Sequence, residues 1–157
     1  MAKKRKYIKQ AFESAGVSSD VSANLYLSML VSPAWQALTA NQQRLYLYCK
    51  LQYYAERQKP RADDPLTFTM NRGKWCTLYH LYTAGNARSF YRDMSELISR
   101  GCVSCVESGA CTRTKSVYRF SAKWRDYGTP DFKILPTEMT SAMRKELLKS
   151  AEKKPPA

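Results

Sequence analysis

The 157-residue chain has no long apolar run and no recognisable export signal. Its longest apolar stretches fall far short of the roughly 20 residues that a membrane-spanning helix needs. The N-terminus also lacks the apolar core of a signal peptide. These absences predict a cytoplasmic protein without a membrane partner, in which the five cysteines are reduced thiols rather than a disulfide framework.

Groups that catalysis requires are equally sparse. The single histidine, His80, lies near the end of a predicted helix and is interpreted as a structural residue. The sequence contains no glycine-rich phosphate-binding loop, no nucleophile elbow and no pair of acids accompanied by a histidine. Asp63 and Asp64 are adjacent but lie in a polar loop, which does not favour a metal site. We therefore expect a protein that is not an enzyme and that carries no cofactor.

Acidic residues are scarce relative to basic ones. The chain has 13 Asp and Glu against 26 Lys and Arg, so its formal net charge is +13. Such an excess creates a positive field that attracts polyphosphates. Basic residues also outnumber acids between Asn86 and Arg125, so the excess does not come only from the tails. We expect nucleic acid as the partner, with double-stranded DNA first, and a basic membrane-binding surface as the competing explanation.

Composition and patterning divide the chain into three parts. Its 44% hydrophobic and 25% charged residues are ordinary values for a globular protein. Residues 1–22 form a basic arm with a short helix, residues 23–135 form the main domain, and residues 136–157 form an amphipathic helix and a tail. The arm is interpreted either as a phosphate-seeking segment or as a solvated tail, and its basic residues are Lys3, Lys4, Arg5 and Lys6.

Residues 32–42 contain two sequence signals for the start of a helix. Ser32 is a good N-cap with Pro33 at the first helical position. Thr39 and Gln42 form a capping box, which begins a long helix that continues to Glu56. The preceding segment, residues 24–30, is apolar and is either a short strand or an extended lead-in. The face that we expect to be buried in the long helix consists of Leu45, Tyr48, Cys49, Leu51 and Ala55.

Residues 66–124 predict a helix-turn-helix followed by a two-stranded wing. LTFTM (66–70) is a short alternating strand, and Asn71 caps a helix that runs to about His80. In this helix we expect buried side chains at Trp75, Leu78 and Tyr79. Gly85 is expected to supply a positive φ in the turn. The fold class is therefore α+β, mostly α: a winged helix-turn-helix domain with N- and C-terminal helical extensions.

The second helix of the pair has clear boundaries and a clear apolar stripe. Asn86 is its expected N-cap and Gly101 its terminator. An apolar stripe follows from the spacing of Phe90, Met94, Leu97 and Ile98. With this stripe buried, the residues that we expect to contact DNA are Asn86, Arg88, Ser89, Tyr91, Arg92 and Ser95. Arginine can donate two parallel hydrogen bonds to guanine, and serine and tyrosine suit phosphate contacts.

Strands over residues 103–108 and 116–124 flank a short polar loop, and together they form the predicted wing. Arg113 and Lys115 lie near its tip and are the expected wing contacts with DNA. Alternation along the second strand places Tyr118 and Phe120 toward the core and Arg119 toward solvent.

Three cysteines in the predicted wing raise the question of a metal. Cys102, Cys105 and Cys111 could bind zinc if Cys76 or His80 supplied a fourth ligand. However, residues three apart on a strand point to opposite faces, and the chain has no second pair of cysteines separated by two residues. We expect core or surface thiols and no metal.

Three segments resemble a known group of proteins. SPAWQALTANQQRLYLYCKL, ARSFYRDMSELISRGCV and YRFSAKWRDYGTPDF are similar to small winged-helix proteins of bacterial phages, plasmids and integrative elements. The likeness covers roughly residues 30–132. It implies a DNA-binding role in transcription regulation, replication or transfer. Cys102 departs from the pattern, because a long aliphatic residue usually follows the helix-terminating glycine in this group.

The C-terminal part of the sequence predicts one more helix, but it does not determine the surface against which this helix packs. The helix begins at Thr137 or Thr140, and Met139, Met143 and Leu147 share one face. This face either docks on the domain itself or mediates a homodimer or contact with a protein partner. Two alternatives to duplex DNA binding remain: a winged domain that docks on another protein, and a single-stranded nucleic-acid binder that uses the tyrosines of the first long helix.

Overall fold

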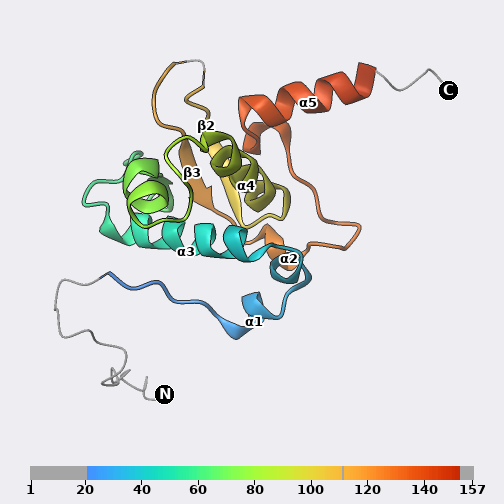
Figure 1. Cartoon of the computed structure of the whole chain (residues 1–157). Coiled ribbons are helices and arrows are strands. Elements are labelled where there is room, and N and C mark those ends of the chain that lie inside the picture. Colours follow the sequence, from blue (N-terminus) through green and yellow to red (C-terminus); the bar gives the residue numbers. More distant parts are fainter. Residues whose placement is uncertain (1–20, 111, 153–157) are drawn as a thin grey trace.

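A computed structural model describes residues 21–110 and 112–152 as an α+β fold (Figure 1). The predicted fold class is thus confirmed at the level of α+β. The helices are α1 (Leu27–Leu30), α2 (Pro33–Gln36), α3 (Ala40–Ala55), the π-helix η2 (Gly73–Leu78), α4 (Ala87–Ser99), the 3₁₀ turns η3 (Lys123–Arg125) and η4 (Pro136–Glu138), and α5 (Ser141–Glu152). The strands are β1 (Thr67–Thr69), β2 (Val103–Glu107) and β3 (Val117–Phe120).

The three strands form one antiparallel sheet in the order β1-β3-β2. β3 is central: its Tyr118 lies opposite Phe68 of β1 and Cys105 of β2. The register between β2 and β3 shifts between Cys105 and Glu107. On β3, Tyr118 is buried and Arg119 is exposed as predicted, but Phe120 is only half-buried and Val117 is buried as well. The described residues of the loop between β2 and β3, 108–110 and 112–116, extend from the domain beside the start of α5 (Figure 1).

Both predicted helix starts before residue 43 are confirmed. The Ser32 hydroxyl accepts a hydrogen bond from the Trp35 N–H at 3.2 Å and caps α2. The Thr39 N–H donates to Gln42 Oε1 at 2.9 Å, and the Gln42 N–H donates to Thr39 Oγ1 at 3.4 Å. These two bonds satisfy donors that have no intrahelical partner at the start of α3.

The buried face of α3 differs from the expected one. Leu45 and Cys49 are fully buried, but Ala55 is exposed and Tyr48 is only half-buried. Tyr46 is buried instead, because its ring packs edge-on against Trp35 and against Phe120, each at 5.7 Å between centroids. Before α3, residues 27–30 form one helical turn rather than a strand.

The predicted helix over residues 71–80 forms, but as a π-helix. Asn71 lies just before it, and its side chain accepts from the Lys74 N–H at 3.1 Å, while Arg72 occupies the N-cap position of the π-helix. The Tyr79 N–H donates to the Lys74 carbonyl five residues earlier, and this wider turn changes which side chains face the core. Trp75 is buried as expected. Leu78 and Tyr79 are 63% and 41% exposed, so the prediction that they are buried is wrong.

The turn between η2 and α4 does not use Gly85 as predicted. Gly85 has no positive φ, whereas His80, two residues after the end of the π-helix, adopts φ 57° and is exposed. The left-handed residue therefore lies where the helix ends, because the backbone must change direction there. Asn86 closes the turn as the N-cap of α4, accepting from the Ser89 N–H at 3.2 Å.

α4 is anchored by its apolar stripe and by a glycine at its end. The predicted stripe is confirmed, with all four members at most 3% exposed: Phe90, Met94, Leu97 and Ile98. Gly101 has φ +73° and donates to Ile98, while the Cys102 N–H donates to Leu97 at 2.9 Å. This pair of bonds is a Schellman motif, which requires the left-handed conformation that glycine adopts without strain.

The C-terminal extension contacts the domain mainly through its beginning. Thr140 caps α5, accepting from the Met143 N–H at 3.3 Å. Ile134 and Met143 pack against the core. Leu147 and Leu148 are 48% and 64% exposed, so the rest of α5 leaves its apolar side chains uncovered.

Gly101→Ala is predicted to destabilise the fold strongly. The added Cβ would lie 2.8 Å from the backbone of Lys123 and Trp124, at a φ that L-residues rarely adopt. We expect the free energy of unfolding in urea to fall by at least about 1 kcal/mol. Gly85→Ala is the matched control, because nothing lies within 4 Å of its Cβ position. Equal stability of the two variants would contradict this account of the α4 terminus.

Candidate nucleic-acid interface

α4 presents the predicted polar face to solvent. Arg88, Tyr91 and Arg92 are exposed, and Ser89 and Ser95 are half-buried. The Asn86 side-chain oxygen is occupied by the helix cap, so only its amide NH₂ is available to a ligand. The Ser95 hydroxyl donates to the Tyr91 carbonyl within the helix at 3.0 Å. Arg88 lies in the first turn, where the positive end of the helix dipole also favours a phosphate.

A buried carboxyl on α4 was missed by the sequence reasoning. Asp93 is only 2% exposed. It accepts hydrogen bonds from Tyr82 Oη at 2.5 Å, Gln42 Nε2 at 3.3 Å and Arg92 Nε at 3.3 Å. These donors come from the turn, from α3 and from α4 itself. The signal that could have found it is an acid three residues after Phe90 and four before Leu97, inside the apolar stripe.

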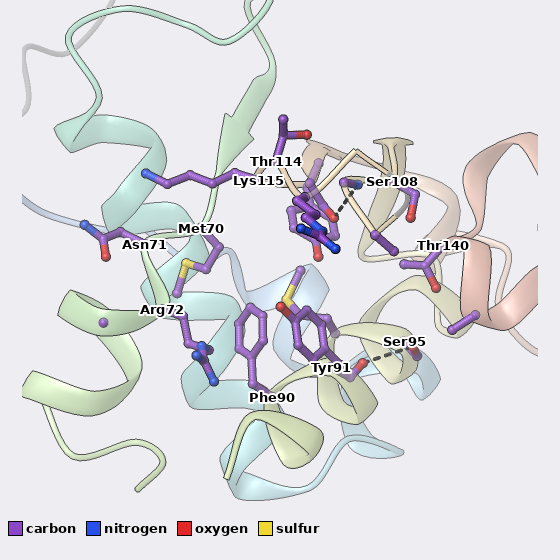
Figure 2. Close-up of a pocket in the computed structure, with 18 residues that line it drawn as sticks. Met70, Asn71, Arg72, Phe90, Tyr91, Ser95, Ser108, Thr114, Lys115 and Thr140 are labelled. Carbon is purple, nitrogen blue, oxygen red and sulfur yellow. Dashed lines mark hydrogen bonds between the residues drawn. The ribbon is translucent and has the colours of Figure 1, made fainter. Parts of the chain in front are cut away.

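A groove of about 720 Å³ separates α4 from the loop over residues 108–116 (Figure 2). Its floor is apolar and includes Phe90, Met94 and Tyr118. The start of η2 and the start of α5 close its other sides. Tyr91 and Ser95, both predicted as DNA contacts, line this groove, as do the predicted wing residues Arg113 and Lys115. The structure thus brings the two wing residues and two of the predicted α4 contacts to one cavity, whereas Asn86, Arg88, Ser89 and Arg92 do not line it.

Arg72 is a lining residue that the sequence reasoning did not select. It lies at the start of η2 and contributes a third basic side chain to the groove. None of the 18 lining residues is Asp or Glu. A cavity with this lining has a positive potential and favours an anionic ligand.

The loop over residues 108–116 is closed by tight backbone packing. The Gly109 N–H donates to the Ser116 hydroxyl at 3.1 Å. A Cβ on Gly109 would lie 2.1 Å from the Thr114 carbonyl oxygen, so no larger residue fits there without rearrangement. Arg113 adopts φ 55° within this loop. This packing holds Arg113 and Lys115 at the edge of the groove.

The acidic residues of α4 and the hairpin form salt bridges outside the groove. Between residues 86 and 125, each acid forms a salt bridge: Asp93 with Arg92, Glu96 with Arg100, and Glu107 with Arg61. Arg119 is exposed as predicted, but it pairs with Asp64 at 3.2 Å. Within the part of the chain that the structure describes, no acid lies within 4.0 Å of the basic groups of Arg88, Arg113 or Lys115. Among these described residues, basic side chains without a nearby acid are therefore present on α4 and on the loop, as they are at other exposed positions such as Lys74 and Arg125.

Four cysteines are core thiols. Cys49, Cys76, Cys102 and Cys105 are all free and buried. Burial raises the pKa of Cys102 to about 12 and that of Cys105 to about 11. Among residues 21–110 and 112–152, no group of three His, Cys, Asp or Glu side chains could hold a metal ion. Cys111 and the basic arm at Lys3, Lys4, Arg5 and Lys6 lie outside the described residues.

The tyrosines of α3 offer little surface for stacking. Tyr46 is 4% exposed, Tyr48 and Tyr53 are half-buried, and Tyr54 is 57% exposed. Tyr48 packs against Trp75 and Tyr79, and Tyr53 against Phe120. The first long helix therefore uses most of its tyrosines for packing.

No protein-family model, curated protein or solved structure matches the chain. No helix in the described segments has the length and apolar character needed to cross a membrane.

Tyr82→Phe is predicted to destabilise the protein, because it removes a donor to the buried Asp93 carboxyl. A hydrogen bond to a charged group contributes about 1.5–3 kcal/mol, and we expect a loss of this size in urea unfolding. The control is Tyr79→Phe, which removes the same hydroxyl from a side chain that is 41% exposed. If Tyr82→Phe unfolded at the same urea concentration as the wild type, the Asp93 network would not stabilise the fold.

Stability is predicted to fall in alkali because of the buried thiols. The pKa of Cys102 is about 12 in the folded protein against an ordinary value of 9.0, so the unfolded chain loses this proton first. The contribution is fully present below pH 9 and disappears as the pH rises, at about 1.4 kcal/mol per pH unit for each thiol. Cys102→Ala should make the decline between pH 9 and 11 shallower. An unchanged slope in urea titrations at these pH values would contradict the assignment.

Proposed function

We propose that this protein is a winged helix-turn-helix protein that binds double-stranded DNA. The observation that carries the proposal is that exposed basic side chains without acidic partners among the described residues lie both on α4 and on the adjacent loop: Arg88, Arg113 and Lys115. In this assignment α4 is the recognition helix and the loop between β2 and β3 is the wing.

The order of elements supports the winged assignment. α3, β1, η2, α4, β2 and β3 follow one another, and a three-stranded sheet in the order β1-β3-β2 brings the hairpin beside α4. In helix-turn-helix proteins the second helix lies in the major groove and its N-terminal residues contact base edges. Arg88 occupies that position on α4. The wing residues Arg113 and Lys115 are then positioned for the neighbouring phosphates.

Base reading by this face rests mainly on Arg88. Arg92 is 68% exposed at its side chain, but its Nε is hydrogen-bonded to Asp93, which fixes the direction of the guanidinium. Its remaining N–H groups can still donate to a base edge or a phosphate. Ser89 and Tyr91 suit phosphate contacts. Phosphate contacts thus outnumber base contacts, which favours moderate sequence specificity.

The likeness to winged-helix proteins of phages and plasmids supports a role in a mobile genetic element. In that setting the protein would be a transcription regulator or an accessory factor for replication or transfer. The high net charge of +13 suits both roles, because each requires fast capture of DNA from solution.

A protein partner is the second candidate function, and α5 favours it. Leu147 and Leu148 are 48% and 64% exposed on this helix. An amphipathic helix with uncovered leucines can pair with a second copy or with another protein. Such a contact would leave α4 and the loop free for DNA.

Loss of the wing charges is predicted to weaken duplex binding in a salt-dependent way. Arg113→Ala/Lys115→Ala should lower the slope of log affinity against log salt by about 2, because each lost phosphate contact contributes about 1. Arg88→Ala should cost about 1–3 kcal/mol on the preferred sequence. Fluorescence anisotropy across a salt series measures both effects.

Arg125→Ala is the matched control, since Arg125 is exposed in η3, at the opposite end of β3 from the loop. The proposal fails if the double variant binds duplex with the same affinity and the same salt slope as the wild type.

A further inference from the structure

The groove beside α4 differs from a surface that only follows a phosphate backbone. It has a volume of about 720 Å³ and an apolar floor that includes Phe90, Met94 and Tyr118. Ligand-binding cavities have comparable volumes and linings. A duplex presents phosphates and base edges, and its base faces are covered by stacking, so it cannot occupy an apolar cavity without local opening.

One wall of the groove is an available aromatic ring. Tyr91 is 56% exposed, and its ring packs edge-on against Phe90 at 5.1 Å between centroids. Figure 2 shows the Tyr91 ring projecting from α4 beside Phe90, on the side that faces the loop. A ring held in this way can stack on a flat, apolar partner. Stacking of a base on an aromatic side chain contributes about 1–3 kcal/mol.

Polar side chains that line the groove add positive charge and hydrogen-bond donors. Arg72, Arg113 and Lys115 line the groove, and no lining residue is acidic. The hydroxyls of Ser108 and Thr140 accept from the N–H groups of Ser141 and Met143, which leaves their own O–H groups able to donate. The cavity therefore suits a ligand with a flat body, hydrogen-bond acceptors and a negative charge.

We propose that this groove holds one unpaired nucleotide of the bound nucleic acid, with its base against Tyr91 and its phosphate between Arg113 and Lys115. This inference rests on the proposed function, because the strand must already lie on the face of α4. Tyr91 and Ser95 belong both to that face and to the groove, so a strand held by Arg88 and the wing passes its mouth. A free mononucleotide has the same chemistry and is the alternative source.

The test compares a blunt duplex with the same duplex carrying a short unpaired tail, in which one tail base is 2-aminopurine. We expect the full chain to bind the tailed duplex about 5- to 150-fold more tightly, the equivalent of one stacked base. The 2-aminopurine fluorescence should change on binding. Tyr91→Ala should bring the ratio of tailed to blunt affinity close to 1, whereas Tyr91→Phe should retain the preference for the tailed duplex.

Tyr54→Ala is the control, because it removes a tyrosine that is 57% exposed on α3 and does not line the groove. Arg72→Ala provides a second groove variant, with a reduced preference expected.

Equal affinity for tailed and blunt duplex would overturn this inference and leave the proposed function intact. Absence of binding to both would overturn the proposed function itself. Displacement of the tail by a free deoxynucleoside monophosphate or an acidic peptide at similar concentration would overturn the assignment to a strand.

Discussion

The buried Asp93 carboxyl is the constraint on which the presentation of α4 depends. A buried charged or polar group is costly unless its hydrogen bonds are satisfied, so the three donors around Asp93 must remain in place. Tyr82 brings the turn to α4, and Gln42 brings the start of α3. Gln42 also completes the capping box with Thr39. One side chain thus couples the beginning of α3 to the rotation of α4, and this rotation decides which residues face solvent.

The apolar core and the salt bridges together determine which basic side chains face solvent without an acidic partner. Burial of the stripe from Phe90 to Ile98 places Arg88 and Tyr91 on the outside, and the Schellman motif at Gly101 directs the chain into β2. Salt bridges pair several acids of the domain with other arginines, as Asp64 does with Arg119. Arg72, Arg113 and Lys115 form no salt bridge among the described residues and line a cavity whose 18 lining residues include no acid. Folding thereby produces a positive field at this cavity.

Local signals in the sequence were sufficient for several helix ends but not for every boundary or for the site. The second wing strand, predicted over residues 116–124, ends at Phe120, and Lys123–Arg125 form a 3₁₀ turn. Caps at Thr39 and Asn86 and the glycine at Gly101 were predicted correctly, because each depends on residues at most five positions away. The π-helical winding of η2 was not predictable from spacing, which assumes 3.6 residues per turn. Asp93 and Arg72 were missed for a different reason. Their roles arise from neighbours that are distant in sequence, such as Gln42 for Asp93, and periodicity contains no information on such contacts.

Under the proposed function, the small number of side chains on α4 that can contact base edges determines how this face would discriminate among nucleic acids. Arg92 is tied to Asp93 and Asn86 to its own helix cap, so direct readout falls mainly to Arg88. A face of this kind binds many duplex sequences with similar affinity, since phosphate contacts carry little sequence information. The groove adds a different criterion, because an apolar floor beside Tyr91 rewards a base that is not paired. Discrimination would then depend on the state of the strand, such as an end or an opened segment, as much as on its sequence.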